Sequence, residues 1–247
     1  MVNKVAQDKS RARFKTPEAG VERPRDVFLA TVDAIAGPLV ARGFKYARSG
    51  PHLTRRTNHV TSKAMFGSSN LNVPGELVSL HITLQAHDSE LGKWRRAQVT
   101  PRRHDDLVAT RHLGHLLTPP RWLEWNLAST RDRLPTTKDI RDTLSDPGLT
   151  FLDSLTTDLV DDPDVSTLAA RVDSESLIEY HVRAGRPDET RPLIEAMLAR
   201  FHERGRAHFA SQVHAFRAGG LPEHQVLGEP NGLAFLVVQF DLPIDVE

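Results

Sequence analysis

The sequence predicts an α+β protein in which an N-terminal helix packs on an antiparallel β-meander and a mostly helical part follows. One observation is the helical spacing of apolar residues over residues 25–42. A second is the strict alternation of apolar and polar residues over 78–87, which is typical of a strand with one buried side. A third is the order of the segments, because the strands follow one another with short connections instead of alternating with helices.

The N-terminal helix is expected over residues 25–42. Its apolar side chains recur at helical spacing and therefore lie along one side: Phe28, Leu29, Val32, Ile35, Ala36, Leu39 and Val40. Pro38 lacks a backbone donor and is expected to kink the last turn. Gly43 suits the left-handed conformation in which many helices end. The chain should therefore leave the helix at Gly43 and enter a sheet.

Four strands are expected after this helix, over residues 44–48, 53–55, 60–66 and 78–87. The last strand is the clearest, because one of its sides is entirely apolar: Val78, Leu80, Ile82, Leu84 and Ala86. The other side is polar: Ser79, His81, Thr83, Gln85 and His87. We expect the helix to pack on the apolar side of the sheet.

The rest of the chain is expected to be mainly helical. Residues 94–100 favour a strand, residues 107–135 strand and loop, and residues 137–144 and 146–160 short helices separated near Pro147-Gly148. Residues 174–216 predict a helical hairpin with a turn at 185–188. The apolar run 233–240 is short and rich in valine and aromatic residues, so a late buried strand is expected. Three regions result: a disordered basic arm (1–22), an α+β domain (23–158) and a helical region (159–247) packed on it.

The composition argues against several classes of functional site. The chain has no cysteine, which excludes disulfides, thiolate metal sites and cysteine nucleophiles. Phosphate-binding loops, hydrolase elbows and zinc-protease motifs are missing, and His112 and His115 form only an HxxH pair. We therefore expect no metal and no cofactor, and we favour a non-catalytic protein. No apolar run reaches the roughly 18 residues that span a bilayer, and no secretory signal is recognisable, so a cytoplasmic location away from membranes is expected.

Charge is divided unevenly along the chain, although its net charge is zero. Residues 1–121 carry 20 basic and 10 acidic residues, whereas residues 122–247 carry 12 basic and 22 acidic residues. Such a division can mark a half that binds an anionic partner. It can equally mean that the two halves attract each other, within one fold or across a homodimer. Both interpretations stay open at the level of sequence.

Ten residues are candidates for a binding surface. Four come from the basic half, which also carries aromatic residues: Arg48, Arg55, Arg56 and Lys63. Such a surface can hold single-stranded nucleic acid by phosphate contacts and base stacking, although the ribonucleoprotein motif is missing. Four more lie on the polar side of the strand 78–87, where a hydrolase could place its site: His81, Thr83, Gln85 and His87. The last two could line a ligand pocket, form a hot spot for a protein partner or close the edge of the core: Trp122 and Trp125.

The segments "RGFKYARSGPHLTRRTNHVTSKAMF" (42–66) and "LVSLHITLQAH" (77–87) resemble the bacterial domain of unknown function 4304. The common pattern is a helix that ends in Gly-Phe, an alternating strand with a basic residue, a polar turn and a strand with Ser-Lys. The later "GLTFLDSL" (148–155) is similar to the helical tail of that family. The resemblance covers roughly residues 26–158 and implies an α+β fold. It implies no activity, because the family has no established catalytic residues.

The expected function is binding of another protein by a non-catalytic, immunity-like or regulatory bacterial protein. The missing catalytic motifs and the divided charge favour this interpretation. Nucleic-acid binding through the basic half and hydrolysis on the polar side of the sheet remain the alternatives.

Overall fold

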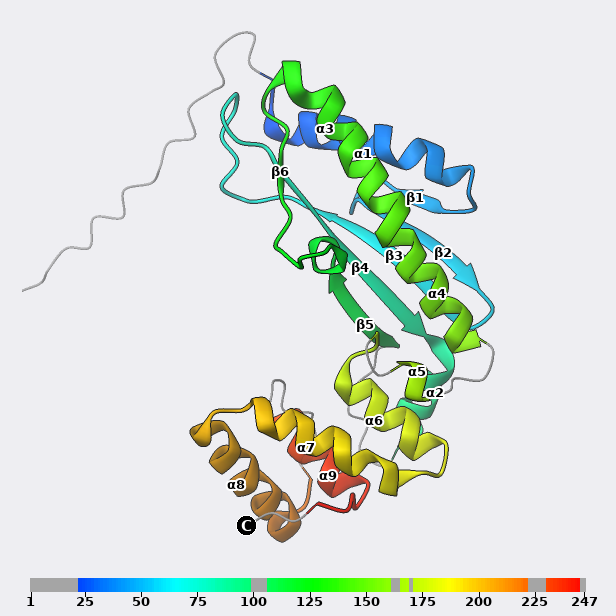
Figure 1. Cartoon of the computed structure of the whole chain (residues 1–247), viewed down its shortest axis with the longest axis vertical. Coiled ribbons are helices and arrows are strands. Elements are labelled where there is room, and N and C mark those ends of the chain that lie inside the picture. The colour runs from blue at the N-terminus through cyan, green and yellow to red at the C-terminus, as the bar shows by residue number, and fades with distance from the viewer. Residues whose placement is uncertain (1–21, 99–105, 161–164, 169–170, 222–229, 245–247) are drawn as a thin grey trace, which may run out of the picture.

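Three helices cover one face of an antiparallel sheet, and further helices lie beyond one end of the strands (Figure 1). The computed structural model describes residues 22–98, 106–160, 165–168, 171–221 and 230–244. The predicted basic arm lies outside these residues except for Glu22. The α+β class and the order of helix, sheet and helical part are confirmed.

Helix α1 (Pro24–Val40) turns most of the predicted apolar stripe toward the sheet, whereas the last predicted residue, Val40, is exposed. It starts with Pro24, whose missing N–H is unpaired at a helix start in any case, and it contains Pro38 in its last turn. Gly43 then adopts a φ of 86°, the left-handed region that glycine enters without strain. The next residue, Phe44, is buried and turns the chain into the sheet.

The sheet is a meander of five strands with a short sixth: β1 (Lys45–Ala47), β2 (His52–Thr57), β3 (Val60–Gly67), β4 (Ser79–Asp88), β5 (Leu107–His112) and β6 (Trp125–Asn126). Strands β1 to β5 are neighbours in chain order, and every pairing is antiparallel. Strand β6 pairs with β4 beyond the end of β5. The four predicted strands are therefore confirmed, and β5 and β6 extend the sheet.

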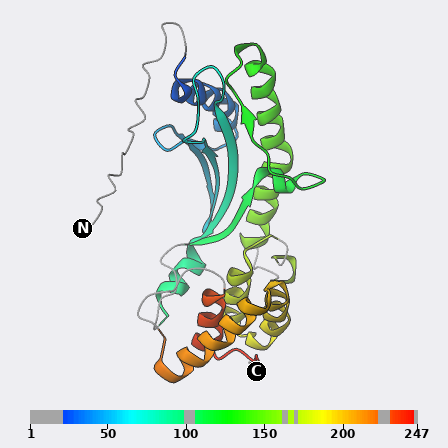
Figure 2. The ribbon, with the colours of Figure 1, turned by 90° about the vertical axis from the view of Figure 1, so that its left-hand side faces the viewer.

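One face of this sheet is the main core of the protein. Its side chains come from alternate positions of the strands and are fully buried beneath the helices: Leu53, Ala64, Phe66, Leu80, Ile82 and Leu84. Helix α1 covers this face together with α3 (Thr130–Thr143) and α4 (Leu149–Val160). In the side view, α3 and α4 run along one side of the sheet (Figure 2). The apolar side predicted for the strand 78–87 is thus the buried side.

Two segments in the middle of the chain differ from the predictions. Residues 94–96 belong to helix α2 (Ser89–Arg96) instead of a strand, because the Asp88 carboxylate accepts the N–H groups of Glu90 and Leu91 and caps a helix there. Helix α3 starts seven residues before the predicted helix, where Ser129 caps it. The predicted separation of two helices near Pro147-Gly148 is confirmed, because Asp146 leaves the helical conformation (φ −107°, ψ 179°) in the irregular turn Leu144–Gly148 between α3 and α4.

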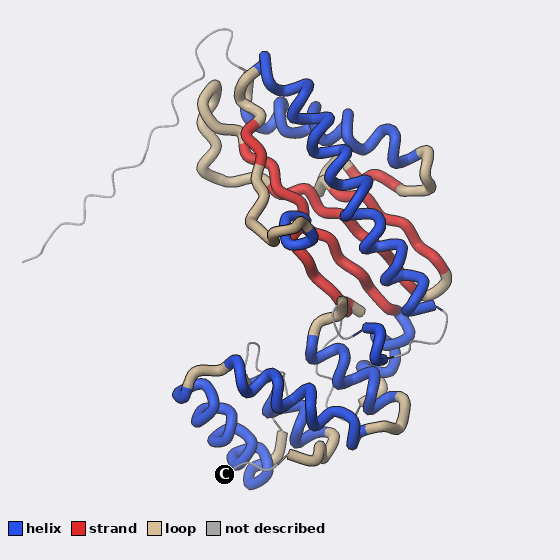
Figure 3. The backbone as a smooth tube through the Cα atoms, in the orientation of Figure 1, coloured by secondary structure: helices blue, strands red, loops and turns tan. Residues whose placement is uncertain are grey.

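The C-terminal part is built from helices, which the tube in Figure 3 shows in blue: α5 (Val165–Leu168), α6 (Ser174–Arg183), α7 (Arg191–Arg200), α8 (Glu203–Gly219) and α9 (Asn231–Gln239). The predicted hairpin is confirmed by α6 and α7, which are joined through Gly185 at a φ of 71°. The predicted late strand is wrong, because residues 233–240 fall largely in α9. Five successive residues of α9, Leu233 to Val237, are buried among the neighbouring helices. Because all five are apolar, the sequence of this run has no alternation of apolar and polar residues that would distinguish a helix from a strand.

A shared core and a buried polar joint connect the sheet to the helical part. Apolar residues at the end of the sheet pack against α4 and α6, and the boundary proposed between residues 158 and 159 falls inside α4. Arg95 of α2 is fully buried and donates to Glu179 of α6 at 2.7 Å and to Ser176 at 2.9 Å. Tyr180 donates to the buried Asp88 carboxylate at 2.7 Å. In the described residues, no helix is both long and apolar enough to cross a membrane.

Candidate functional site: the open face of the sheet

The side of the sheet turned away from α1, α3 and α4 is the candidate site, and we call it the open face. Residues directly opposite each other in antiparallel strands point to the same side, so the pairing register defines its members. They include Lys45, His52, Thr54, Arg56, Thr61, Lys63, Met65, His81, Thr83, Gln85, His87, Thr110 and His112. All of them are half-buried or exposed except His112. Six of the ten predicted site residues belong to this face.

An aromatic and imidazole cluster occupies one end of the open face. Trp122 stacks on His112 with 3.8 Å between the ring centroids and 14° between the planes. His81 lies 5.8 Å from Trp122, and His115 lies 5.3 Å from His112. Trp122 is nevertheless 61% exposed. We call these four residues the Trp122 cluster; it joins two predicted candidates, His81 and Trp122, that lie 41 residues apart in the sequence.

Two glycines make room for the Trp122 cluster. Trp122 lies in the loop between β5 and β6 (residues 113–124), which projects from the ribbon in Figure 2. Gly114 has no side chain, and a Cβ atom at this position would lie 2.2 Å from the Arg121 carbonyl oxygen. The Arg121 N–H also bonds the Gly114 carbonyl at 3.0 Å and closes the loop. On β3, a Cβ at Gly67 would lie 2.1 Å from Nε2 of His81.

His112 supports the cluster as a neutral, buried ring. Its Nδ1 accepts the Gly114 N–H at 3.2 Å, so the proton of the neutral ring sits on Nε2. Nε2 is buried and has no hydrogen-bond partner in the described part of the chain. Burial lowers the pKa of His112, and the neighbouring His115 and His81 lower this pKa further. Three histidines close together suggest a metal, but the described residues contain no group of three that could hold one.

A second histidine lies at the opposite end of the open face. Nδ1 of His87 and Oδ1 of Asp106 are 2.9 Å apart, so the carboxylate orients the ring. His87 Nε2 is buried without a hydrogen-bond partner. The residue across the strand pair is Thr61, whereas His81 pairs with Gly67 at the other end of β4. His81 and His87 are thus on one face, as predicted, but the structure does not bring them together.

The four predicted basic residues divide into two groups. Arg48 is bonded to Asp33 of α1 at 3.0 Å. Arg55 points to the helix side, where it pairs with Asp153 of α4 and lies 4.6 Å from the ring of Phe44. Both are used within the fold. The other two, Arg56 and Lys63, lie on the open face, where Arg56 donates to the backbone oxygen of Asn58 at 3.0 Å.

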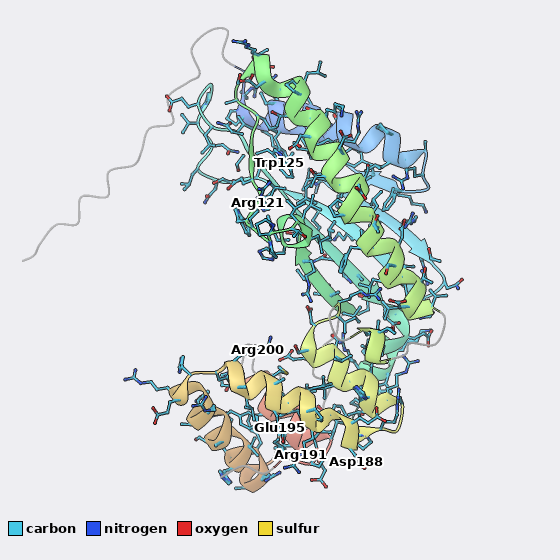
Figure 4. All side chains as sticks on the ribbon, in the orientation of Figure 1. Arg121, Trp125, Asp188, Arg191, Glu195 and Arg200 are labelled. Atoms are coloured by element: carbon cyan, nitrogen blue, oxygen red, sulfur yellow. The ribbon has the colours of Figure 1, made fainter. Side chains whose placement is uncertain are left out.

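The two predicted tryptophans have different roles. Trp125 is buried, pairs with Leu80 through β6 and donates its Nε1–H to Asp139 at 2.7 Å. Of the three roles predicted for the tryptophans, Trp125 therefore has the structural one, closing the edge of the core. Figure 4 labels Trp125 beside α3 and Arg121 on the loop that carries Trp122. Sequence reasoning considered His112 and His115 only as an HxxH pair and missed their position beside Trp122, although Gly114 between them indicates a close backbone approach.

Two surface depressions at the start of α1 are weaker candidates. One, of about 290 Å³, is lined by Glu22, Val27, Val78 and Arg133 among others, and two of these lining residues, Glu22 and Arg133, form an ion pair. The other, of about 300 Å³, is lined mainly by the loop after β3 and by Arg25 and Phe28. None of the buried polar atoms that lack a partner in the described residues belongs to their lining residues. The open face is therefore the stronger candidate.

Comparison with known proteins adds no further assignment. No protein-family model, no curated protein and no solved structure matches this chain.

Proposed function

We propose that the protein is a non-catalytic binding protein, immunity-like or regulatory, that holds another protein on the open face with Trp122 as the anchor. The observation that carries the proposal is the position of Trp122, whose large apolar ring is exposed and yet fixed flat against His112. A tryptophan held in this way loses little conformational freedom on binding. Exposed, rigid tryptophans are typical of the residues that dominate binding energy at protein interfaces.

The surroundings of Trp122 fit an interface of this kind. Met65, also on the open face, is 37% exposed, and polar side chains such as Thr83 and Gln85 lie beside it. An apolar anchor surrounded by polar groups is the usual arrangement of a protein interface. The separation of His81 and His87 at opposite ends of β4 favours binding over catalysis.

The test compares proteins captured by the wild type and by two variants. Trp122→Ala removes the anchor, and Leu134→Ala is the matched control, because Leu134 is an apolar residue of α3 that is 81% exposed. Immobilised proteins are incubated with lysate of the source organism, and captured proteins are quantified by mass spectrometry. We expect at least one protein to bind the wild type and Leu134→Ala and to bind Trp122→Ala on the order of thirty-fold more weakly. If every captured protein is insensitive to Trp122→Ala, the proposal is wrong.

Single-stranded nucleic acid is the second candidate ligand. Lys63 and Arg56 on the open face, with an exposed tryptophan at its end, favour this function. It predicts binding to oligonucleotides that weakens steeply with salt. A gel-shift series with single-stranded and duplex probes at low salt tests it. A hydrolase with its site on the polar side of the sheet, around His81, Thr83, Gln85 and His87, remains a third proposal. Membership of the domain of unknown function 4304, a bacterial source and a cytoplasmic location also remain proposals.

A further inference from the structure

The charged side chains of the sheet are sorted by face. On the helix side, each of them has a partner of opposite charge or a strong donor. Arg55 pairs with Asp153, and Arg111 pairs with Asp173 at 3.5 Å. Asp88 accepts the hydroxyl of Tyr180. The helix side of the sheet is therefore electrically satisfied within the chain.

The open face differs, because the charged residues that the strands themselves place on it, other than histidine, are all cations, and the two nearby carboxylates, Asp106 and Glu124, lie at its ends beside His87 and His112. Along the strands β1 to β5 the cations are Lys45, Arg56 and Lys63. None of the three forms an ion pair with a carboxylate of the described residues, and the strands place no acid on this side. Lys45 and Lys63 flank Thr54 in one row across the sheet, so their backbones are about 10 Å apart. Arg56 follows Thr54 by two residues, or about 7 Å along β2.

The acidic half of the chain does not neutralise these three cations. Its described carboxylates that reach the basic half bind other arginines: Asp153 binds Arg55, Glu179 binds Arg95, and Asp173 binds Arg111. All three of these arginines are on the helix side or in the buried joint. These ion pairs link the two halves within the fold but do not involve the cations of the open face. The positive potential of the open face is therefore directed toward solvent.

We propose that the protein partner of the open face is acidic and places carboxylates against Lys45, Arg56 and Lys63. This inference rests on the proposed protein-binding function and adds the chemistry of the partner. In the same complex, an apolar group of the partner covers Trp122 and Met65. Opposite charges across an interface accelerate association and select the partner, while the apolar anchor supplies most of the affinity.

An acidic protein segment fits this face better than a nucleic acid does. Sheets that bind single strands present aromatic side chains on their central strands, where bases stack. The central strands here carry Thr54, Thr61, Thr83 and Gln85 on the open face, and the exposed aromatic ring is confined to one end. Arg48 and Arg55, which would have added phosphate contacts, are bonded to Asp33 and Asp153.

The test uses three fluorescein-labelled probes of equal length. The first is a 16-residue peptide of alternating Glu and Val with a central Trp, the second has Gln in place of every Glu, and the third is an oligothymidylate. Binding to the full chain is measured by fluorescence anisotropy at low and high salt. We expect the Glu peptide to bind, the Gln peptide to bind at least ten-fold more weakly, and added salt to weaken the Glu complex.

Charge reversal locates the binding surface. The variant Lys45→Glu/Arg56→Glu/Lys63→Glu should lose at least ten-fold in affinity for the Glu peptide. The control variant Arg131→Glu/Arg204→Glu/Arg217→Glu changes the net charge equally at exposed positions on α3 and α8 and should retain its affinity. Far-ultraviolet circular dichroism checks folding, and the neutral triple variant with Gln at 45, 56 and 63 replaces the first if charge reversal unfolds it.

Four outcomes overturn the inference: no binding of the Glu peptide, equal binding of the Gln peptide, equal loss in the control variant, or tighter binding of the oligothymidylate that depends on the same three cations. The proposed function is judged separately. If a captured protein depends on Trp122 but tolerates the triple charge reversal, the acidic partner is wrong and protein binding stands. If no captured protein depends on Trp122, the proposed function itself fails.

Discussion

His112 has two structural roles, and both favour the neutral form of its ring. Its Nδ1 caps the Gly114 N–H, and its ring is the support of Trp122. Both tasks are compatible with a neutral ring, whereas a charged ring would be buried beside two other imidazoles. The nearby Glu124 carboxylate opposes this effect only in part, so the pKa of His112 remains below its ordinary value of 6.5.

The lowered pKa of His112 predicts a loss of stability on acidification. Above the ordinary pKa of 6.5, the ring is neutral in both the folded and the unfolded chain. Below it, the unfolded chain takes up a proton that the folded chain resists, so the free energy of unfolding falls as the pH decreases. Urea unfolding from pH 7.5 to 5 should show a smaller decrease for His112→Asn, whose amide oxygen can still cap Gly114.

His181 gives the background for this measurement. Burial lowers its pKa too, in spite of the nearby Glu189 carboxylate, so part of the decrease should persist in His112→Asn. The interpretation is contradicted if wild type and variant lose stability equally over this pH range.

Single residues also show where sequence reasoning stopped. The basic character of Arg48 and Arg55 was visible, but their partners were not. Asp153 lies 98 residues from Arg55, and only the packing of α4 on the sheet brings the two together. By contrast, the open-face positions of His81, Thr83, Gln85 and His87 followed from alternation alone, because the period of a strand fixes the side of every residue.

At the scale of elements, the loop between β5 and β6 depends on Gly114. Gly114→Ala should displace the loop, because the new methyl group meets the backbone oxygen of Arg121 and not a flexible side chain. We expect a cost of about 1–3 kcal/mol in the free energy of unfolding and greater quenching of tryptophan fluorescence by acrylamide as Trp122 leaves His112. Gly50→Ala is the control, since a Cβ at Gly50 has no atom within 4 Å. Unchanged quenching in Gly114→Ala would contradict this account of the loop.

The elements that the sequence predicted best were those with one apolar, buried side and one polar, more accessible side. Helix α1 has a buried and an exposed side and strand β4 a buried and a half-buried, polar side, so their periods of 3.6 and 2 were visible in the sequence. Helix α9 is apolar on every side of its middle turns, and such a run is ambiguous between helix and strand. The prediction for helix α2 was wrong for another reason. Its residues are mostly polar or charged and show no clear apolar period, and its start depends on the Asp88 cap.

At the scale of the whole molecule, the sheet and the helical part depend on a buried ion pair. Both side chains of Arg95 and Glu179 are almost completely buried. Burial and the adjacent Asp88 carboxylate raise the pKa of Tyr180, which keeps its hydroxyl protonated as the donor of the second bond across this joint. The joint therefore fixes α6 on α2 and β4 through directional bonds as well as apolar packing.

Removing one partner of this joint should be costly. Glu179→Ala leaves the Arg95 charge buried without its main carboxylate, and we expect a loss of about 3–5 kcal/mol in the free energy of unfolding. The control is Glu195→Ala on α7, where an exposed pair with Arg191 should contribute less than about 1 kcal/mol (Figure 4). Urea denaturation measures both variants. Equal losses would show that the joint is not a major source of stability.

The uneven division of charge along the chain was the sequence feature that said most about how the two halves interact. Of its two interpretations, attraction between the halves accounts for Arg55, Arg95 and Arg111, which bind carboxylates of the second half. The sequence could not reveal which basic residues would remain, because that depends on which side of a strand each occupies and on where α4 and α6 pack.

The edges of the sheet bear on how the open face can stay uncovered. An exposed sheet invites another chain to add a strand wherever a long edge offers free N–H and C=O groups. Here one outer strand, β1, has three residues, and the other edge is divided between β5 and the two-residue β6 by the loop that carries Trp122. Neither edge is a long template for strand addition. The protein can therefore present a broad sheet surface to a partner while resisting growth into edge-to-edge aggregates.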